Sequence, residues 1–476
     1  MRIAFSLYGQ VAGIIERDGG RTRLSYLPEY QADALATPLS LSMPVSPTTY
    51  TSRSVEAYLD GLLPDNKEVR ARWARRAGVR PGNTLGLIAH VGMDVSGGAM
   101  FAREDEIADA IERPGALVPA SDAEIAARLR RVRRDDAAWQ DDEDDEHWSL
   151  AGAQSKFTLA LTPSGWAFPE GSAASTHIVK PGIGRIRAQA LSEHVSMRAL
   201  ALAGLDVAAT EHRTFEDQDA IVITRFDRRV RSEGPAARIH QEDVLQAFGM
   251  DPQRKYEADR GPGVKQIADL LRVAAGGASV ERFAKAVIAN QIIGAPDAHG
   301  KNYGLLLIGP STTLAPLYDV ATGLIPDRTG LLRYTKGAMS VGGERRFGDV
   351  ERENWTKFAR ALELPTAQVV DWVDELATSL PTAFRQAAAE TTAPDSDFLA
   401  GVVADAVSAV AEQTRNGLTS SRRTHGRLIT PFVRTLAGQE PLRSSVRADG
   451  PTMPAAGGPP AGDLPSSSDQ DAPWGS

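Results

Sequence analysis

One short stretch of the chain combines the side chains that phosphoryl transfer requires. Asp297 and Asn302 are separated by four residues, in a segment where a predicted helix gives way to a predicted strand. This is the spacing of a protein-kinase catalytic loop, in which the Asp accepts or orients the proton of the attacking hydroxyl and the Asn reaches a magnesium ion. The spacing alone is not specific, because Asp297 after Pro296 could instead cap a turn.

A second acid follows at a suitable distance. Residues 303–308 and 314–317 are predicted to form a hairpin that leads to Asp319, preceded by Tyr318. Kinases have a second metal-binding acid at this point of the chain. Mg²⁺ prefers oxygen ligands and keeps water and phosphate oxygens in its shell, so Asp319 and the Asn302 carboxamide are adequate protein ligands.

Three upstream features occur in the order that a kinase uses them. The small-residue turn Ala151–Lys156 would let backbone N–H groups approach a phosphate. Lys180 ends a predicted strand and could contact phosphate as a point charge, and Glu193 on the next predicted helix could hold that lysine. Ordinary structural roles remain open: a surface strand end for Lys180, and a helix-dipole preference for Glu193. The order of the whole series favours the functional interpretation.

The predicted elements around these residues indicate an α+β protein. Residues 1–110 suggest a β-rich subdomain, with strand-like runs at 3–16, 23–27 and 39–44, a hairpin turn at Asp18–Gly20 and a helix at 67–77. Hairpin 157–168, strand 176–180, helix 188–203 and strands 206–214 and 220–226 follow, and the chain is mostly helical from residue 241. We predict the units 1–110, 111–148, 149–240, 241–420 and 421–476.

Two of these units are less regular. The segment 111–148 combines an Arg-rich helix at 121–134 with the acidic run Asp141–Glu146, which we expect to be a solvated linker because like charges repel. Residues 451–476 include 14 Pro, Gly or Ser, too polar a composition to bury a core. We therefore expect 421–476 to be a disordered tail.

Composition excludes several classes of protein. The 476 residues are 42% apolar and 24% charged, as in an average globular protein, and they include no cysteine, which excludes thiol chemistry and disulfides. With 53 basic and 61 acidic residues the net charge of −8 argues against a chain-wide field for nucleic acid. The sequence contains no run of 18 apolar residues, so it predicts no membrane span. We expect a cytoplasmic protein.

The chain resembles the HipA family of serine/threonine kinases, the toxin half of HipBA toxin–antitoxin systems. The resemblance covers most of residues 1–420. It rests on motifs at 39–44, Gly61–Asn66, Ser149–Lys156, Arg225–Arg228, Gln241–Asp243, Lys255–Glu257 with Gly261–Gly263, Asp297–Asn302 and Tyr318–Asp319. It implies an atypical two-lobed, protein-kinase-like fold with a β-rich N-terminal subdomain and a mostly helical C-terminal lobe, using ATP and Mg²⁺.

By position, the resemblance also implies a role for each motif residue. Asp297 is the catalytic base, and Asn302 and Asp319 bind Mg²⁺. The ATP-binding residues are Ala151, Gly152, Ala153, Gln154, Ser155 and Lys156 of the phosphate loop, Lys180, the hinge residues Gln241, Glu242 and Asp243, and His299, Lys301, Asn302, Tyr318 and Asp319. Glu193 supports Lys180.

The resemblance further implies regulation, substrate and partners. Ser149 matches an autophosphorylated serine, and a phosphate there, close to acids 141–146, is expected to eject the loop and switch the kinase off. Family substrates are aminoacyl-tRNA synthetases, notably glutamyl-tRNA synthetase, so that growth arrest and persistence follow. The partner is a small helix-turn-helix antitoxin that bridges the kinase to operator DNA. Two alternatives stay open: a kinase-like co-repressor scaffold, and a small-molecule or lipid kinase.

Overall fold

The N-terminal part of the chain folds around an antiparallel sheet. The structure, a computed structural model, describes residues 1–51, 53–113, 115–140, 146–231, 234–327 and 330–419. The five-stranded sheet has the order β4-β3-β2-β1-β6. Its strands are β1 (Arg2–Leu7), β2 (Gln10–Asp18), β3 (Arg21–Tyr26), β4 (Tyr50–Thr51) and β6 (Met100–Arg103), and the helices around it are α1 (Pro28–Gln31), α2 (Arg53–Gly61), α3 (Lys67–Arg76), α4 (Thr84–Val91) and α5 (Ile107–Glu112).

Two predicted strands in this region are wrong in detail. The run 3–16 is two strands, because Tyr8 and Gly9 take positive φ angles of 51° and 82° and turn the chain back on itself. Residues 39–44 form only one isolated bridge, between Ser40 and Met43. Prolines stand at positions 38 and 44, and the Leu41 N–H donates to the side-chain carboxylate of Glu242 on β16, so this segment does not join a sheet through its backbone.

A second antiparallel sheet forms the middle of the molecule. It has six strands in the order β12-β13-β11-β9-β10-β7. The strands are β7 (Leu117–Pro119), β9 (Phe157–Thr162), β10 (Gly165–Pro169), β11 (His177–Lys180), β12 (Thr210–Phe215) and β13 (Gln218–Thr224), with helices α6 (Asp122–Arg134) and α7 (Gln189–Leu202) packed against it. Short strands β5 (Asp94–Val95) and β8 (Trp148–Ser149) pair in parallel and join this sheet to the N-terminal part.

The rest of the described chain is mostly helical, as predicted. Its helices are α8 (Val244–Ala247), α9 (Val264–Ala274), α10 (Gly276–Ile293), α11 (Arg352–Ala361), α12 (Thr366–Ala389), α13 (Ser396–Phe398) and α14 (Ala404–Thr419), with short turns η1 (Glu257–Asp259), η2 (Gly300–Asn302) and η3 (Leu399–Val403). Its strands are β14 (Arg228–Arg229), β15 (Ala237–Arg238), β16 (His240–Asp243), β17 (Gly304–Ile308), β18 (Ser311–Leu314), β19 (Lys336–Val341) and β20 (Glu344–Arg346).

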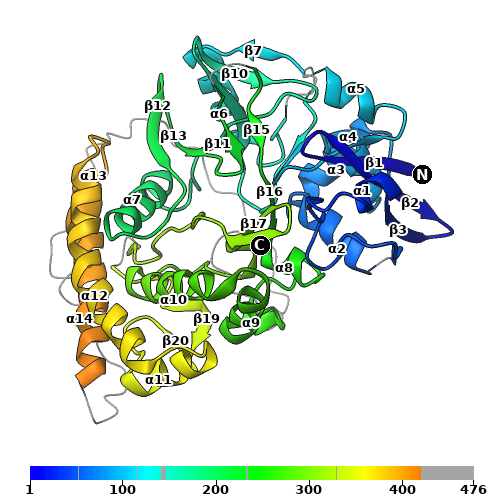
Figure 1. Cartoon of the computed structure of the whole chain (residues 1–476). Coiled ribbons are helices and arrows are strands. Elements are labelled where there is room, and N and C mark those ends of the chain that lie inside the picture. Colours follow the sequence, from blue (N-terminus) through cyan, green and yellow to red (C-terminus); the bar gives the residue numbers. More distant parts are fainter. Residues whose placement is uncertain (52, 114, 141–145, 232–233, 328–329, 420–476) are drawn as a thin grey trace, which may run out of the picture.

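The two largest of three hydrophobic cores in the described residues correspond to two lobes. One core unites the N-terminal sheet with the six-stranded sheet and includes Trp73, Trp139 and Trp148. The other lies among the C-terminal helices and includes Trp355 and Phe384. Figure 1 shows the blue N-terminal sheet beside the six-stranded sheet, with α9–α12 and α14 forming the separate helical lobe. The α+β, two-lobed prediction is confirmed.

The segment between the two sheets is more ordered than predicted. Arg128 on α6 is buried, donates to the Glu146 carboxylate at 2.6 Å and lies over the rings of Phe157 and Phe168. A buried guanidinium needs a counter-charge, so the prediction of a solvated linker is wrong for Glu146. Residues 141–145 and the predicted tail 421–476 lie outside the described residues. Within the described part of the chain, we find no helix that is both long and apolar enough to span a membrane.

Candidate active site

The predicted catalytic loop connects α10 to β17. Helix α10 ends at Gly294, whose φ of 68° is left-handed and where a Cβ atom would lie 2.4 Å from the Leu324 side chain. The loop then passes through Asp297 and closes with η2, which ends at Asn302. The Asn302 carboxamide donates to the Asp297 carbonyl oxygen at 2.8 Å. This bond fixes the two predicted residues at opposite ends of one short loop.

The Asp297 carboxylate sits in a buried polar setting. The Tyr256 hydroxyl donates to its Oδ1 at 2.7 Å, and His299 Nε2 lies 3.7 Å from the same oxygen. The rings of Tyr256 and His299 pack edge to face with centroids 4.8 Å apart. Burial raises the pKa of Asp297 to about 7, although Lys255 and the Tyr256 hydrogen bond oppose the rise. A carboxylate with such a pKa is suited to taking a proton near neutral pH.

Asp319 meets the lysine and the glutamate that the sequence predicted as a pair. Lys180, at the end of β11, donates to the Glu193 carboxylate on α7 at 2.8 Å and also to Asp319 Oδ1. Burial disfavours the ammonium form of Lys180, but the carboxylates of Asp319 and Glu193 outweigh it and raise the lysine pKa. Asp319 has a left-handed backbone with φ of 59°. A non-glycine residue in that region is strained, and such strain is concentrated at functional sites.

The predicted phosphate loop lines the same cavity as the predicted catalytic loop. Lys156 Nζ donates to the Ala151 carbonyl oxygen at 2.6 Å and lies 5.1 Å from the centre of the Trp139 ring. Gly152 has a φ of 101°, which an L-residue with a side chain rarely adopts. Burial, with the nearby charge of Lys180 second, lowers the pKa of Lys156 to about 7. A bound anion would reverse this effect by favouring the charged form.

One cavity brings most of the predicted site together. Its lining includes Ala151, Gly152, Ala153, Gln154, Lys156, Lys180, Glu193, Gln241, Asp243, Asp297, His299, Lys301, Asn302, Tyr318 and Asp319. These residues come from both lobes and from segments more than 160 positions apart. Their convergence is the arrangement that the series of sequence signals predicts.

Three predicted residues do not line that cavity. Ser155 points toward Asp136, at 3.3 Å from its carboxylate. Glu242 turns to the opposite face of β16, where its carboxylate accepts the Leu41 N–H at 2.7 Å. Ser149 is fully buried and its hydroxyl donates to the Leu62 carbonyl oxygen at 2.8 Å. The correction for Glu242 follows from strand geometry, because neighbouring residues of a strand point to opposite sides.

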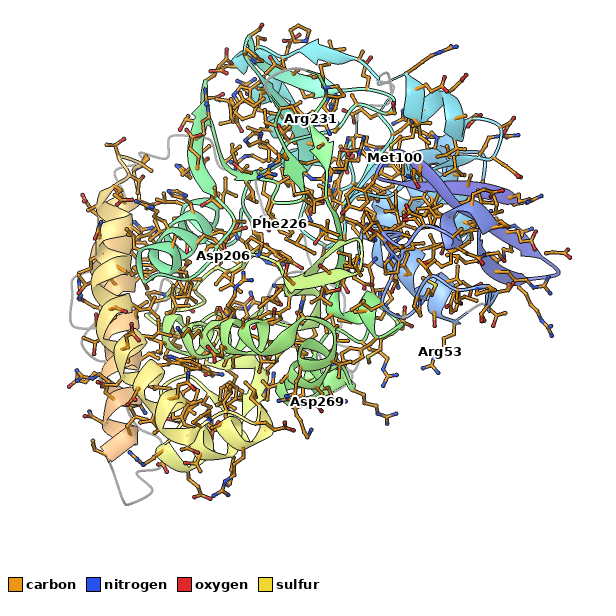
Figure 2. The ribbon with its side chains drawn as sticks, viewed as in Figure 1. Arg53, Met100, Asp206, Phe226, Arg231 and Asp269 are labelled. Atoms are coloured by element: carbon orange, nitrogen blue, oxygen red, sulfur yellow. The ribbon has the colours of Figure 1, made fainter. Side chains whose placement is uncertain are left out.

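The cavity also contains residues that sequence reasoning left without a role there. Asp65, Gln189, Phe226 and Lys255 line it, and Tyr256 lies behind the wall, bonded to Asp297. Figure 2 shows Phe226 near the centre of the molecule, between the six-stranded sheet and the C-terminal helices. Gln189 links the predicted phosphate loop to α7, since its Oε1 accepts from Gln154 at 3.1 Å and its Nε2 donates to Glu193 at 3.3 Å. The 225–228 and 255–257 motifs were the available sequence signal for Phe226, Lys255 and Tyr256.

The motif at 225–228 has a mainly structural role. Arg225 donates to the Asp227 carboxylate at 2.8 and 2.9 Å, and Arg228 donates to Asp94 at 2.7 Å. All four side chains are buried. This network holds the chain where it passes from β13 to β14, directly beside the cavity.

Asn302 and Asp319 fit a Mg²⁺ ion. The Asn302 amide nitrogen is bonded to the carbonyl oxygens of Asp297 and, at 3.4 Å, Asp319, which leaves its side-chain oxygen available. Asp319 uses one carboxylate oxygen for Lys180 and keeps the other, and its side chain is 44% exposed. Magnesium sites in phosphoryl-transfer enzymes combine one or two such ligands with phosphate and water oxygens. The two residues therefore supply the donor set that this ion requires.

Comparison with known proteins agrees with this geometry. Residues 3–101 match the model of the HipA N-terminal domain, and residues 148–384 match the model of the HipA-like C-terminal domain. The Y4mE protein of Sinorhizobium fredii is 33% identical over 386 residues, which cover 78% of this chain and 89% of that protein. The serine/threonine-protein kinase toxin HipA of Shewanella oneidensis is 29% identical, over 73% of this chain and 80% of that protein.

The fold likeness extends over nearly the whole described chain. HipA in the Shewanella oneidensis complex of HipA, HipB and operator DNA superimposes with a TM-score of 0.73 and 23% identity, covering 87% of this chain and 99% of that chain. At that identity the superposition shows the fold alone, whereas the sequence match to Y4mE and the two domain models show the family. The chain belongs to the HipA family of kinases.

Proposed function

We propose that this protein is an ATP- and Mg²⁺-dependent serine/threonine protein kinase. The observation that carries the proposal is the convergence of Asp297, Asn302, Asp319 and the Lys180–Glu193 pair on one cavity. A carboxylate for the hydroxyl proton, two oxygen ligands for a metal and a buried lysine for phosphate are the parts that phosphoryl transfer uses. Positioning and electrostatics supply most of the acceleration in such a site.

Asp297 is the group that receives the proton. In the transfer step the acceptor hydroxyl oxygen forms a bond to the γ-phosphorus of ATP, the bond from that phosphorus to the β–γ bridging oxygen breaks, and ADP leaves. The hydroxyl proton goes to the Asp297 carboxylate, one oxygen of which is held by Tyr256. The other oxygen is left to face the incoming hydroxyl.

The remaining residues bind and orient the nucleotide. Lys180, held by Glu193, contacts phosphate oxygens, and the backbone of the Ala151–Lys156 turn surrounds them. Ile178, Ile223 and Phe226 form an apolar part of the cavity wall that suits a purine base. Asn302 and Asp319 hold Mg²⁺, which when bound neutralises charge that develops on the phosphate oxygens.

Ser149 is the residue we propose for autophosphorylation. It lies directly before the predicted phosphate loop, on β8, and is fully buried, so it must leave its place to accept a phosphate. A phosphate carries about −1.5 to −2 charges at neutral pH. Such a group cannot return to the apolar position beside Leu62. Modification would thus displace the adjoining loop and switch the kinase off.

We propose the biological setting from the relatives. The relative from Shewanella oneidensis is the serine/threonine-protein kinase toxin HipA, and a HipA of that organism has been solved in complex with HipB and operator DNA. By analogy this protein is a toxin that pairs with a small helix-turn-helix antitoxin and, through it, with operator DNA. Its substrate would be a translation component, such as glutamyl-tRNA synthetase or another aminoacyl-tRNA synthetase, which would lead to growth arrest and persistence.

One experiment tests the proposal. The purified full chain is incubated with Mg²⁺ and ATP labelled on the γ-phosphate, alone and with a cell lysate, and labelled species are identified by mass spectrometry. We expect label on Ser149 and on a serine or threonine of a second protein. Label only in a small molecule or lipid would replace the protein-kinase assignment, and absence of all transfer would leave a co-repressor scaffold as the function.

A further inference from the structure

Asp65 belongs to the N-terminal domain, yet its side chain forms part of the cavity wall. It stands between α2 and α3, directly after the buried run Leu62–Pro64 and directly before Asn66. The Asn66 side chain caps α3 by accepting the Glu68 N–H at 2.9 Å. A helix cap on one side and a buried segment on the other fix the backbone of Asp65.

Three bonds connect Asp65 to three other segments. Its backbone N–H donates to the Gly152 carbonyl oxygen of the predicted phosphate loop at 2.9 Å. Its carboxylate accepts from Lys301 of the catalytic loop at 2.7 Å and from Lys255 at 3.3 Å. Lys255 in turn accepts the Gly300 N–H at 3.1 Å through its backbone carbonyl. Asp65 therefore touches both loops between which the nucleotide would lie.

Asp65 is a counter-charge for two enclosed lysines. Its carboxylate faces two ammonium groups, and the side chains of Asp65, Lys301 and Lys255 are only 12, 6 and 14% exposed. Enclosing two ammonium groups without an anion is costly, so Asp65 allows both lysines to stay charged there. Two further carboxylates act on these lysines at the same cavity, Asp243 on Lys301 and Asp297 on Lys255.

We propose that Asp65 is a positioning residue for phosphoryl transfer, which holds Lys301 and Lys255 toward the transferring phosphate and fixes Gly152 on the other side of it. This inference rests on the proposed function and deepens it, since it makes the N-terminal domain a working part of the kinase site. A loop or lysine displaced by about 1 Å can cost a hundredfold in rate. The effect belongs to the transfer step, because both lysines lie on the catalytic-loop side of the cavity.

Asp65→Asn tests this role in the full chain, with Asp60→Asn as the matched control. Asp60 lies in the same domain and pairs with Arg70, outside the cavity. We expect Asp65→Asn to lower kcat at saturating ATP at least tenfold, with a smaller change in the KM for ATP. We expect Asp60→Asn to stay within twofold of the wild type in kcat. Thermal unfolding of both variants reports whether they fold.

A second comparison separates positioning from general structural support. Replacing both lysines by Met should lower kcat by itself, and adding Asp65→Asn to that double variant should then lower kcat by no more than about twofold, because Asp65 acts through those two lysines. The inference is overturned if Asp65→Asn lowers kcat by the same factor with and without the lysine substitutions. It is also overturned if the Asp65→Asn variant has the wild-type kcat and KM.

Should Asp65→Asn fail to fold, Lys255→Met removes one held cation and leaves Asp65 paired with Lys301. A wild-type kcat in that variant also overturns the inference. A wild-type protein that transfers no phosphate contradicts the proposed function instead, so the two failures are distinguishable.

Discussion

The Tyr256 hydroxyl donates a hydrogen bond of 2.7 Å to Oδ1 of Asp297, and the two residues are 41 positions apart. Tyr256 lies on the segment before η1. The backbone of this segment is bonded to the predicted catalytic loop, because the Gly300 N–H donates to the Lys255 carbonyl oxygen. The orientation of the proposed general base is therefore set from outside its own loop. Burial raises the pKa of Tyr256, so its hydroxyl stays protonated and remains a donor.

Loss of this hydroxyl should slow transfer with little effect on ATP affinity. A hydrogen bond to a charged group contributes about 1.5–3 kcal/mol, so we expect Tyr256→Phe to lower kcat by roughly tenfold to a hundredfold and to leave the KM for ATP within about threefold. Tyr303→Phe is the control, because its buried hydroxyl bonds Asn290 and lies outside the cavity. Equal kcat values for the two variants would show that Tyr256 does not orient the base.

Part of the site could be predicted because its signals are local. Asp297 and Asn302 share one loop, and the Lys180–Glu193 pair spans one strand and the next helix. Spacing along the chain is then a fair guide to distance in space. Asp65 lies in the motif 61–66, but the motif does not reveal its role, because its partner Lys301 is 236 positions away and the bond depends on how the N-terminal domain packs.

The errors in the predicted hinge follow from strand geometry. Gln241, Glu242 and Asp243 lie on β16, where alternate side chains point to opposite faces. Gln241 and Asp243 line the cavity, whereas Glu242 faces the 39–44 segment. Assigning all three residues of the motif to nucleotide binding ignores this alternation. Which face is the cavity face is decided by tertiary packing, which the motif does not contain.

Glu242 should make the stability of the protein depend on pH. Burial, opposed by hydrogen bonds from Leu41 and Ser40, raises the pKa of Glu242 from 4.5 to about 8. The folded state therefore binds a proton that the unfolded state has released, and stability falls as pH rises between about 4.5 and 8. This part of the free energy of unfolding changes by on the order of 1 kcal/mol for each pH unit in that window.

Glu242→Gln should remove that dependence, since a carboxamide does not titrate and can still accept the Leu41 N–H. Its free energy of unfolding, measured by urea denaturation from pH 5 to pH 8, should rise relative to the wild type as pH increases. The exposed Glu211 on β12 gives the control variant Glu211→Gln. A constant difference between Glu242→Gln and the wild type across this range would mean that Glu242 is ionised in the folded protein.

Charge at position 149 should disrupt nucleotide binding. Ser149 is fully buried against the Leu62 carbonyl oxygen, and the adjoining residues Leu150–Gln154 line the cavity. A buried carboxylate without a partner is strongly unfavourable, so Ser149→Asp should displace the segment and weaken ATP binding at least tenfold in calorimetry. Ser149→Ala should bind ATP as the wild type does. Ser164→Asp, in the exposed β9–β10 turn, controls for added charge. Similar ATP affinities for Ser149→Asp and Ser149→Ala would contradict the proposed switch.

The most direct test of the account is the rate of γ-phosphoryl transfer by Asp297→Asn. This substitution keeps the size of the side chain and an acceptor for Tyr256 but removes the base, and general-base catalysis contributes about 10²–10⁴ in rate. Asp269→Asn, which changes an exposed pair with Lys265 on α9, is the control. We predict at least a hundredfold loss of transfer for Asp297→Asn, with an unchanged thermal midpoint, and wild-type transfer for Asp269→Asn. Transfer by Asp297→Asn at the wild-type rate would contradict the assignment of this loop as the catalytic centre.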